Sequence, residues 1–352
     1  MPHEDDIGTT LLTNNYQAEH LHMSQDQTKN ASVCSMCTVC KIRRPNIEWQ
    51  KEFTYEEIEA ATDGFSLKNC ISESGNPFSA FKGKLEGDLK IVVKQHEITN
   101  IQVKEKMKSE VQTILKARHN NVVMLLGSST KDRFMLIVYE YACNGSLDMF
   151  LSRESGKTLA WSERMRVAIG LSRGLKYLHD KNIIHGNIKP NNILLTHDFK
   201  PMVHNLDNNC LGDFDLGKKL EPKKSCNNKI IGNSEYIAPE YQEKGKLSTK
   251  TDVYSFGVVI LELITGRKAE DKISGDKRLV EWAKPLLGGK KYSELVDPII
   301  SKTYEEDQLR WLVKVIAQCL KKKPKERFSM NMVSPIYYDM SNKKFKLQTE
   351  ET

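Results

Sequence analysis

Short runs of apolar, β-branched and aromatic residues come first in the part of this sequence that carries a folding pattern. Three of these runs are Ile91 to Lys94, Val122 to Leu126 and Phe134 to Tyr139. Side chains of these types favour extended strands, because they pack well on a pleated surface. The pattern therefore predicts an antiparallel sheet in the first half of the chain.

A helix is expected between the first two of these strands. Apolar residues recur there at helical spacing, at Val103, Met107, Val111, Ile114 and Leu115. Glu110 lies three residues after Met107 and four before Ile114, which places its carboxylate on the apolar face of the helix. An unpaired buried charge costs several kcal/mol, so Glu110 is expected to have a cationic partner.

The second half of the chain carries mainly helical periodicity. One apolar stripe runs from Met165 to Leu178, and a second, nearly all-apolar segment runs from Val258 to Ile264. The first 52 residues are polar and show no apolar period. The sequence therefore predicts a disordered leader over 1–52, a β-rich lobe over 53–141, a helical lobe over 142–340 and a tail over 341–352.

Composition narrows the class of protein further. A chain of 352 residues with 39% hydrophobic content can bury a large core. We interpret the net charge of +7 mainly as solvated basic surface, and no nucleic-acid partner is expected. No apolar run approaches the roughly 18 residues that cross a bilayer, and Met1 to Asn30 is too polar for a signal peptide. A cytoplasmic location, with the eight cysteines reduced, is therefore expected.

Several motifs follow one another in a characteristic order. Ile91-Val-Val-Lys94 precedes Glu110, and later motifs are His185-Gly-Asn-Ile-Lys-Pro-Asn-Asn192, Ala238-Pro-Glu240, Asp252-Val-Tyr-Ser-Phe-Gly257 and Arg327. Together with Phe53-Thr-Tyr-Glu-Glu-Ile-Glu-Ala-Ala-Thr-Asp-Gly-Phe65, this series resembles plant receptor-like and receptor-like cytoplasmic Ser/Thr protein kinases. The resemblance implies an α+β fold, the two-lobed protein kinase-like fold with a β-rich N-lobe, a helical C-lobe and a nucleotide cleft between them.

The resemblance also implies which residues bind a nucleotide and its metal ion. Lys94 would hold the α and β phosphates and pair with Glu110. Glu240 would pair with Arg327, and Asp252 would brace the catalytic loop. The implied cofactors are ATP with Mg²⁺ or Mn²⁺, and protein partners in a signalling complex are expected. The other candidate site residues are Ile71, Ala80, Glu140, Ala142 and Leu194 around the nucleotide, Asn187 and Lys189 in the catalytic loop, and Asn192 and Asp213 at the metal.

The position of the metal-binding aspartate depends on where an insertion is placed. Counting from Asn192 without a gap reaches Asn205-Leu-Asp207, which would remove the metal ligand. An insertion of about eight residues instead reaches Leu211-Gly-Asp-Phe-Asp-Leu-Gly-Lys218. We prefer the second alignment, because its neighbours and its distance to Ala238-Pro-Glu240 match the family pattern. Asp213 is then the metal ligand.

The chain departs from the family at positions that carry the chemistry. Asn187 replaces the aspartate that orients and deprotonates the substrate hydroxyl, and an amide cannot take up a proton at neutral pH. Gly186 replaces the arginine that would clasp a phosphorylated activation loop. The loop from Ile71 to Ala80 keeps one glycine where the family has three, which weakens its hold on phosphates. We therefore expect a pseudokinase that still binds ATP, though weakly.

Two other hypotheses stay open. One is an active Ser/Thr protein kinase that transfers the γ-phosphate of ATP to protein hydroxyls despite Asn187, with Lys94 and Asp213 stabilising the transferred charge. The other attributes the insertion between Val203 and Cys210 to a faulty gene structure or a decaying gene copy. The sequence of the transcript across that stretch, or failure of the purified chain to fold, would separate this last hypothesis from the others.

Cys34, Cys37 and Cys40 form a regularly spaced series just before a basic patch that begins at Lys41. A structural zinc site needs four ligands, and no fourth Cys or His follows at the usual spacing. Acylation beside a basic patch would supply two membrane signals, so peripheral membrane attachment through these cysteines is a second hypothesis. The third is that they are unmodified thiols in a flexible leader.

Overall fold

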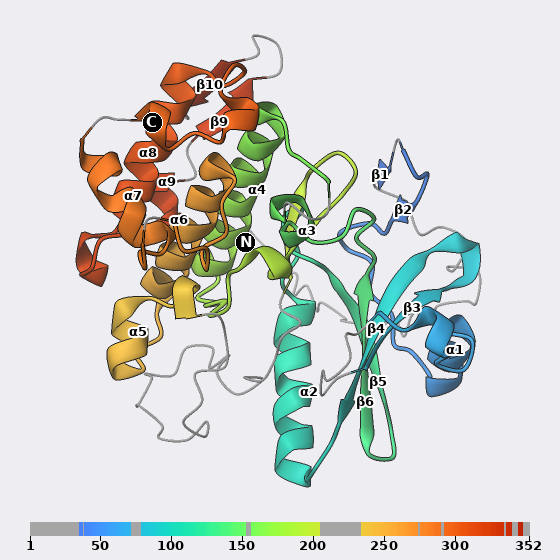
Figure 1. Ribbon diagram of the computed structural model, residues 1–352. Coiled ribbons are helices and arrows are strands. Elements are labelled where there is room, and N and C mark those ends of the chain that lie inside the picture. The colour runs from blue at the N-terminus through green and yellow to red at the C-terminus, as the bar shows by residue number, and fades with distance from the viewer. Residues whose placement is uncertain are drawn as a thin grey trace, which may run out of the picture. The chain divides into compact units, whose positions relative to one another are not determined.

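A β-rich N-lobe precedes a helical C-lobe along the chain (Figure 1). The two-lobed α+β fold that the sequence predicts is therefore confirmed. The computed structural model describes residues 35–37, 39–71, 79–152, 156–204, 234–273, 275–289, 292–333, 336–339 and 344–347.

The N-lobe is built on a four-stranded antiparallel sheet with the strand order β3-β4-β6-β5. The predicted antiparallel sheet is thus confirmed. The strand β5 begins at Leu125 and not at Val122, because Val122 instead bridges Val203 of the C-lobe. The strands of the sheet are β3 (Ser79–Lys84), β4 (Lys90–Glu97), β5 (Leu125–Lys131) and β6 (Phe134–Glu140).

Each face of this sheet packs against a helix, which explains the unbroken apolar runs of its inner strands. On β6, Ile137 packs into an apolar cluster with residues of α2 (Ile101–Leu115). The next residue, Val138, points to the other face and packs in a cluster with Ile58 of α1 (Tyr55–Ala61). Because alternate residues of a strand point to opposite faces, a strand covered on both sides must be apolar at every position.

The folded chain starts before the lobe boundary that the sequence predicts. The strands β1 (Ser35–Met36) and β2 (Arg43–Arg44) pair antiparallel. Further along, the carbonyl oxygen of Lys51 passes so close to β5 that a β carbon on Gly127 would lie 2.1 Å from it. Glycine is required where a backbone approaches this closely. Two-residue strands carry no apolar period, so the sequence pattern could not show this extension.

The C-lobe is helical, and α6 lies at its centre with α4, α7 and α8 packed around it (Figure 1). The stripe from Met165 to Leu178 lies on α4, and the nearly all-apolar run from Val258 to Ile264 lies on α6, as the sequence predicts. A helix surrounded by other helices needs no polar face. The helices of this lobe are α3 (Asp148–Leu151), α4 (Trp161–Asp180), α5 (Pro239–Lys244), α6 (Thr249–Thr265), α7 (Leu279–Gly288), α8 (Glu306–Cys319) and α9 (Met330–Val333).

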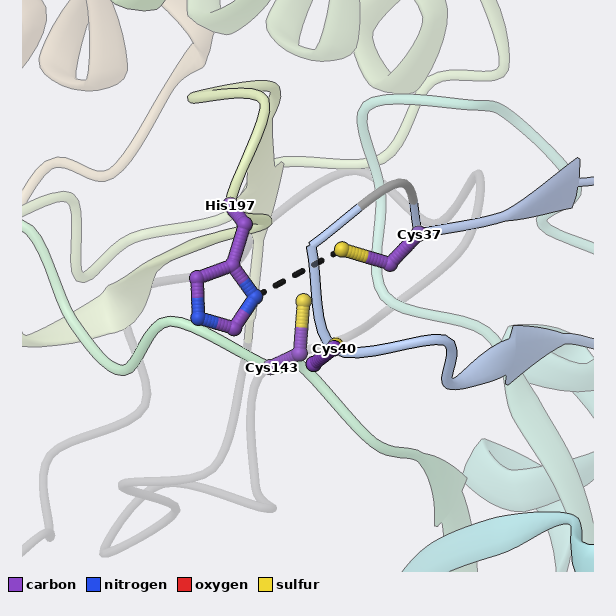
Figure 2. Close-up of side chains that lie close together, drawn as sticks. All are labelled: Cys37, Cys40, Cys143 and His197. Atoms are coloured by element: carbon purple, nitrogen blue, oxygen red, sulfur yellow. Dashed lines mark hydrogen bonds between the residues drawn. The ribbon is translucent and has the colours of Figure 1, made fainter.

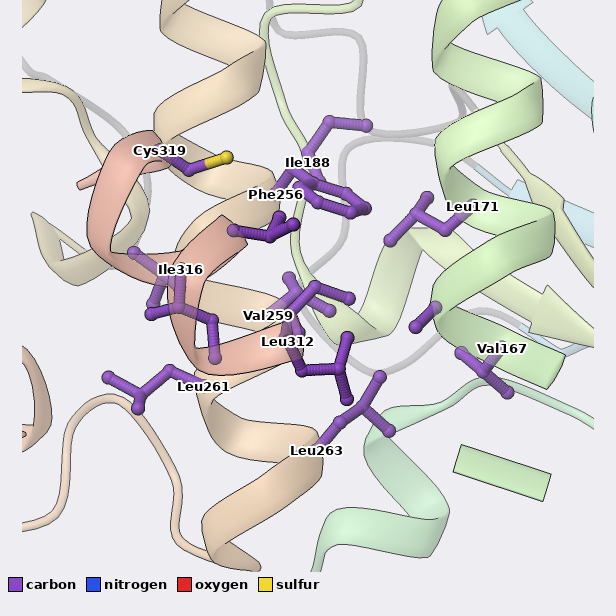
Figure 3. Packing of buried hydrophobic residues seen from close by; sticks show 14 of the residues in the cluster. Val167, Leu171, Ile188, Phe256, Val259, Leu261, Leu263, Leu312, Ile316 and Cys319 are labelled. Atoms are coloured by element: carbon purple, nitrogen blue, oxygen red, sulfur yellow. The ribbon is translucent and has the colours of Figure 1, made fainter. Parts of the chain in front are cut away.

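The core between these helices is close-packed. Figure 3 shows Leu171 of α4, Val259 of α6 and Leu312 of α8 gathered in one cluster, and all three are buried. The approach of α6 to α8 depends on a small residue, because a β carbon on Gly257 would lie 2.8 Å from the β carbon of Cys319. A larger side chain there would have to push the two helices apart.

Two short hairpins complete the described structure. One pairs β7 (Ile193–Leu195) with β8 (Pro201–Val203), and the other pairs β9 (Ile336–Asp339) with β10 (Lys344–Leu347). The first hairpin contacts the segment that follows β6 and links the two lobes. The N–H of Asn144 in this link donates to the carbonyl oxygen of Leu195 at 3.0 Å. No helix in the described ranges has the length and apolar content needed to cross a bilayer.

Candidate functional site

The loop expected to carry the catalytic residues is held by a buried aspartate of α6. The carboxylate of Asp252 accepts hydrogen bonds from the backbone N–H groups of His185 (2.9 Å) and Gly186 (2.7 Å). It also lies 2.9 Å from the Nε2 atom of His179. Hydrogen bonds to an ionised group are stronger than those between neutral groups. The expectation that Asp252 braces this loop is therefore confirmed.

Both ring nitrogens of His185 form hydrogen bonds to the backbone. Its Nδ1 accepts the N–H of Asn187 at 3.2 Å, and its Nε2 lies 3.3 Å from the carbonyl oxygen of His204. This pattern assigns the ring proton to Nε2. Burial lowers the pKa of His185, which favours the neutral ring. His185 is therefore a packing and hydrogen-bonding residue.

Asn187, Lys189 and Asn192 lie in this one loop. The Nδ2 of Asn192 donates to the carbonyl oxygen of Asn187 at 2.9 Å. The carbonyl oxygen of Asn192 accepts the N–H of His204 at 2.8 Å, which joins the loop to the end of β8. Asn192 is buried, whereas Asn187 and Lys189 are half-buried. The loop is thus held at both ends, and Asn187 is positioned between them.

The residues expected around a nucleotide come from the sheet and from the link between the lobes. Lys94 of β4 is buried and lies opposite Ala80 of β3 in the strand register. The N–H of Ile71 donates to the carbonyl oxygen of Ala80 at 2.8 Å. Ala142 belongs to the apolar cluster on the α2 side of the sheet, and Leu194 of β7 packs against this cluster. These five residues come from β3, β4 and β7, from the segment before β3 and from the link after β6.

Some of the expected site residues lie outside the described part of the chain. They are Asp213, the alternative segment Asn205-Leu-Asp207 and the loop residues from Ser72 to Phe78. Glu110 lies in the described backbone of α2, but its side chain is not described. The pairing of Lys94 with Glu110 therefore stays a prediction.

Glu140, at the end of β6, has a cationic partner that the sequence analysis missed. Its buried carboxylate forms a bidentate ion pair with Arg44, with Nε to Oε2 at 2.5 Å and Nη2 to Oε1 at 2.8 Å. The Oε1 atom also accepts the N–H of Met124 at 2.8 Å. The planar guanidinium matches a carboxylate in this geometry. Arg44 thereby fastens the segment before the sheet to the end of β6. The signal available in the sequence was a carboxylate at the end of an apolar strand.

His204 lies buried behind Tyr139 and close to Lys94. The rings of His204 and Tyr139 meet edge to face with centroids 5.4 Å apart. Among the described residues, the ring nitrogens of His204 have no hydrogen-bond partner. Burial, and then the charge of Lys94, hold the pKa of His204 well below its usual value. His204 therefore packs as a neutral ring, which the sequence gave no reason to expect.

A second buried ion pair holds the Ala238-Pro-Glu240 motif. The Nη1 and Nη2 atoms of Arg327 each lie 2.7 Å from one carboxylate oxygen of Glu240. The Arg327 guanidinium also donates to the carbonyl oxygens of Lys250, Lys321 and Lys322. The expected pairing of Glu240 with Arg327 is confirmed.

Comparison with known proteins agrees with this arrangement. The family described as "Protein tyrosine and serine/threonine kinase" matches residues 74–336, which is more than half of the chain. The chain belongs to the protein kinase family. The matched range includes the sheet and the helices of the second lobe, so these are the N-lobe and the C-lobe of a kinase domain.

This kinase domain is similar to curated plant kinases, all from Arabidopsis thaliana. It is 38% identical to "Proline-rich receptor-like protein kinase PERK8" over 293 residues, which are 80% of this chain and 42% of that protein. It is 35% identical to "Receptor-like serine/threonine-protein kinase ALE2" over 290 residues, covering 80% and 37% of the two chains. It is 34% identical to "Probable serine/threonine-protein kinase PBL21" over 326 residues, covering 90% and 83%. The chain thus spans about two fifths of the length of the two receptor-like relatives.

Proposed function

We propose that this kinase domain is a pseudokinase. It binds ATP with Mg²⁺ or Mn²⁺, transfers phosphate slowly or not at all, and acts in signalling by binding protein partners in the cytoplasm. The observation that carries this proposal is Asn187 at the position of the catalytic base, in a loop whose backbone is still held by Asp252. The loop has therefore kept its backbone arrangement, and what it has lost is the carboxylate of the base at residue 187.

Phosphoryl transfer leaves a protein few tasks besides positioning, neutralising charge and handling one proton. The family uses a carboxylate to orient the substrate hydroxyl and accept its proton. The side chain of Asn187 can accept a hydrogen bond but cannot take up a proton at neutral pH. Removing a positioned base costs about a hundredfold to ten-thousandfold in rate. Because Asn187 replaces the carboxylate, we expect ATP to bind without efficient transfer of its phosphate.

The described residues fit a nucleotide and a divalent ion in part. Lys94 is a buried cation, and buried cations require anionic partners, which the resemblance assigns to phosphates and Glu110. The Nδ2 of Asn192 is committed to the carbonyl oxygen of Asn187, so its Oδ1 is the atom that would ligate Mg²⁺. Asp213 would be the second ligand. The metal ion, when bound, would neutralise phosphate charge.

Gly186 supports a role that does not depend on phosphorylation of the activation loop. Its φ angle is +76°, a left-handed conformation that favours glycine. A guanidinium at this position would hold a phosphate of the activation loop, and glycine supplies none. We therefore propose that partner binding controls this domain.

Nucleotide binding is tested by thermal unfolding of the purified chain with and without ATP and Mg²⁺. Nucleotide at about 100 times its Kd adds about 2.7 kcal/mol to the free energy of unfolding, so the melting temperature should rise. Lys94→Met should abolish the rise. Lys82→Met should keep it, because Lys82 is an exposed residue of the neighbouring strand β3.

An unchanged melting temperature of the native chain at saturating ATP would show that the nucleotide part of the proposal is wrong. The alternative, an active Ser/Thr kinase despite Asn187, predicts the same rise together with transfer of the γ-phosphate. Binding and transfer therefore have to be measured separately.

A further inference from the structure

Four side chains that bind metals well converge beside the link between the lobes. Figure 2 shows Cys37 and Cys40 from the turn between β1 and β2, Cys143 from the link after β6, and His197 from the turn between β7 and β8. Their potential ligand atoms all lie within 4.8 Å of one another, and all four residues are half-buried. Residues from three separate parts of the chain therefore present three thiols and one imidazole to a common point.

The spacing of these atoms is close to that of a tetrahedral zinc site. Zinc bonds of about 2.3 Å to sulfur and about 2.0 Å to nitrogen put two sulfurs about 3.8 Å apart and a sulfur and a nitrogen about 3.5 Å apart. The Sγ of Cys37 lies 3.5 Å from the Nδ1 of His197. No two of the four ligand atoms lie more than 4.8 Å apart. A rotation of side chains on binding can bring separations of this size to the zinc values.

Backbone hydrogen bonds hold the segments that carry these ligands. The N–H of Lys41 donates to the carbonyl oxygen of Cys37 at 3.0 Å, and the N–H of Cys37 donates to that of Ile42 at 2.9 Å. These bonds close a tight turn that carries both Cys37 and Cys40. On the other side, the Nδ2 of Asn144 donates to the carbonyl oxygen of Thr196 at 3.2 Å. The residues that follow Cys143 and precede His197 are thereby tied together.

We propose that Cys37, Cys40, Cys143 and His197 form a structural zinc site of the Cys₃His type. Four protein ligands leave no open position on zinc, so the site is structural and not catalytic. It fastens the segment before the N-lobe to the link between the lobes and to a hairpin of the C-lobe, next to the ion pair of Arg44 with Glu140.

This ligand set differs from the one considered in the sequence analysis. There, a zinc site lacked a fourth ligand, because Cys143 and His197 lie far along the chain from Cys37 and Cys40. Cys34 lies outside the described residues and is not needed for a complete set. Thiols that ligate zinc cannot also be acylated, so the zinc site excludes membrane attachment through Cys37 and Cys40.

The test is the zinc content of the purified full chain, measured by elemental mass spectrometry after dialysis under reducing conditions. We expect a stoichiometry of one zinc ion per chain. Cys40→Ser, Cys143→Ser and His197→Ala should each lose the metal, whereas His197→Cys should keep it with a fourth thiolate. Cys70→Ser is the matched control and should keep it, because Cys70 is a half-buried cysteine outside the cluster.

A second measurement, made on the native chain, tests the proposal even if the variants fail to fold. Co²⁺ titrated into the reduced, metal-free native chain should give the absorption bands of a tetrahedral site with thiolate ligands, and Zn²⁺ should displace it. The proposal would be overturned if the native chain contained no zinc and gave none of these bands. So would a disulfide or an acyl group on Cys37 or Cys40 in the intact protein, or equal zinc content in Cys143→Ser and Cys70→Ser. None of these outcomes depends on kinase activity.

Discussion

Replacing Asn187 with aspartate is expected to raise the rate of phosphate transfer by about a hundredfold to ten-thousandfold over that of the native chain. The reason is that the loop around this position is already arranged for a base. Asp252 binds the two preceding backbone N–H groups, and Asn192 donates to the carbonyl oxygen of residue 187. Aspartate has nearly the same shape as asparagine and adds the carboxylate that can accept the proton.

The measurement is initial-rate transfer of labelled γ-phosphate to a generic basic protein substrate, with saturating ATP and Mg²⁺. Asn191→Asp is the matched control, because it adds the same charge at an exposed neighbouring position. Lys94→Met in the Asn187→Asp background should remove the gain. An equal gain in Asn191→Asp, or no gain in Asn187→Asp, would mean that residue 187 is not what limits transfer.

Arg327→Met is expected to lower the free energy of unfolding by about 3–5 kcal/mol. The side chain of Arg327 is 0% exposed, and that of Glu240 is 12% exposed. Removing the guanidinium would leave a nearly buried carboxylate without its cation and three carbonyl oxygens without their donor. Methionine has a similar volume, so the cost arises from charge and hydrogen bonding and not from a cavity.

Urea unfolding of the native chain and of Arg327→Met, followed by circular dichroism, measures this loss in the free energy of unfolding. Arg310→Met is the control, since Arg310 pairs with Glu306 on α8 with both side chains more than half exposed. An exposed pair of this kind contributes about 1 kcal/mol or less. If Arg327→Met cost no more than Arg310→Met, the buried ion pair would not be a main anchor of the C-lobe.

Periodicity in the sequence was enough to predict the elements that form the two cores. The helices α2, α4 and α6 and the strands β4 and β6 each contain several apolar residues at one spacing, so their type could be predicted from a local window. The ion pair of Glu240 with Arg327 and the bracing role of Asp252 followed from the resemblance and are confirmed.

Contacts between distant segments could not be predicted in this way. Arg44 meets Glu140, and Cys37 meets His197, although each pair is separated by many residues with no shared period. The position of His204 behind Tyr139 likewise depends on how β8 packs against the sheet. A local pattern records which face of an element is buried, but it does not record which distant side chain completes a charge or a set of ligands.

The central claim, that this kinase domain has lost efficient phosphate transfer, is tested most directly on the native chain. Labelled γ-phosphate from ATP is followed into the chain itself and into a generic basic substrate, with Mg²⁺ and then with Mn²⁺, beside Lys94→Met and Asn187→Asp. We predict that the native chain transfers phosphate at least about a hundredfold more slowly than Asn187→Asp does. Transfer by the native chain at a rate close to that of Asn187→Asp, and lost in Lys94→Met, would contradict the claim and establish an active kinase.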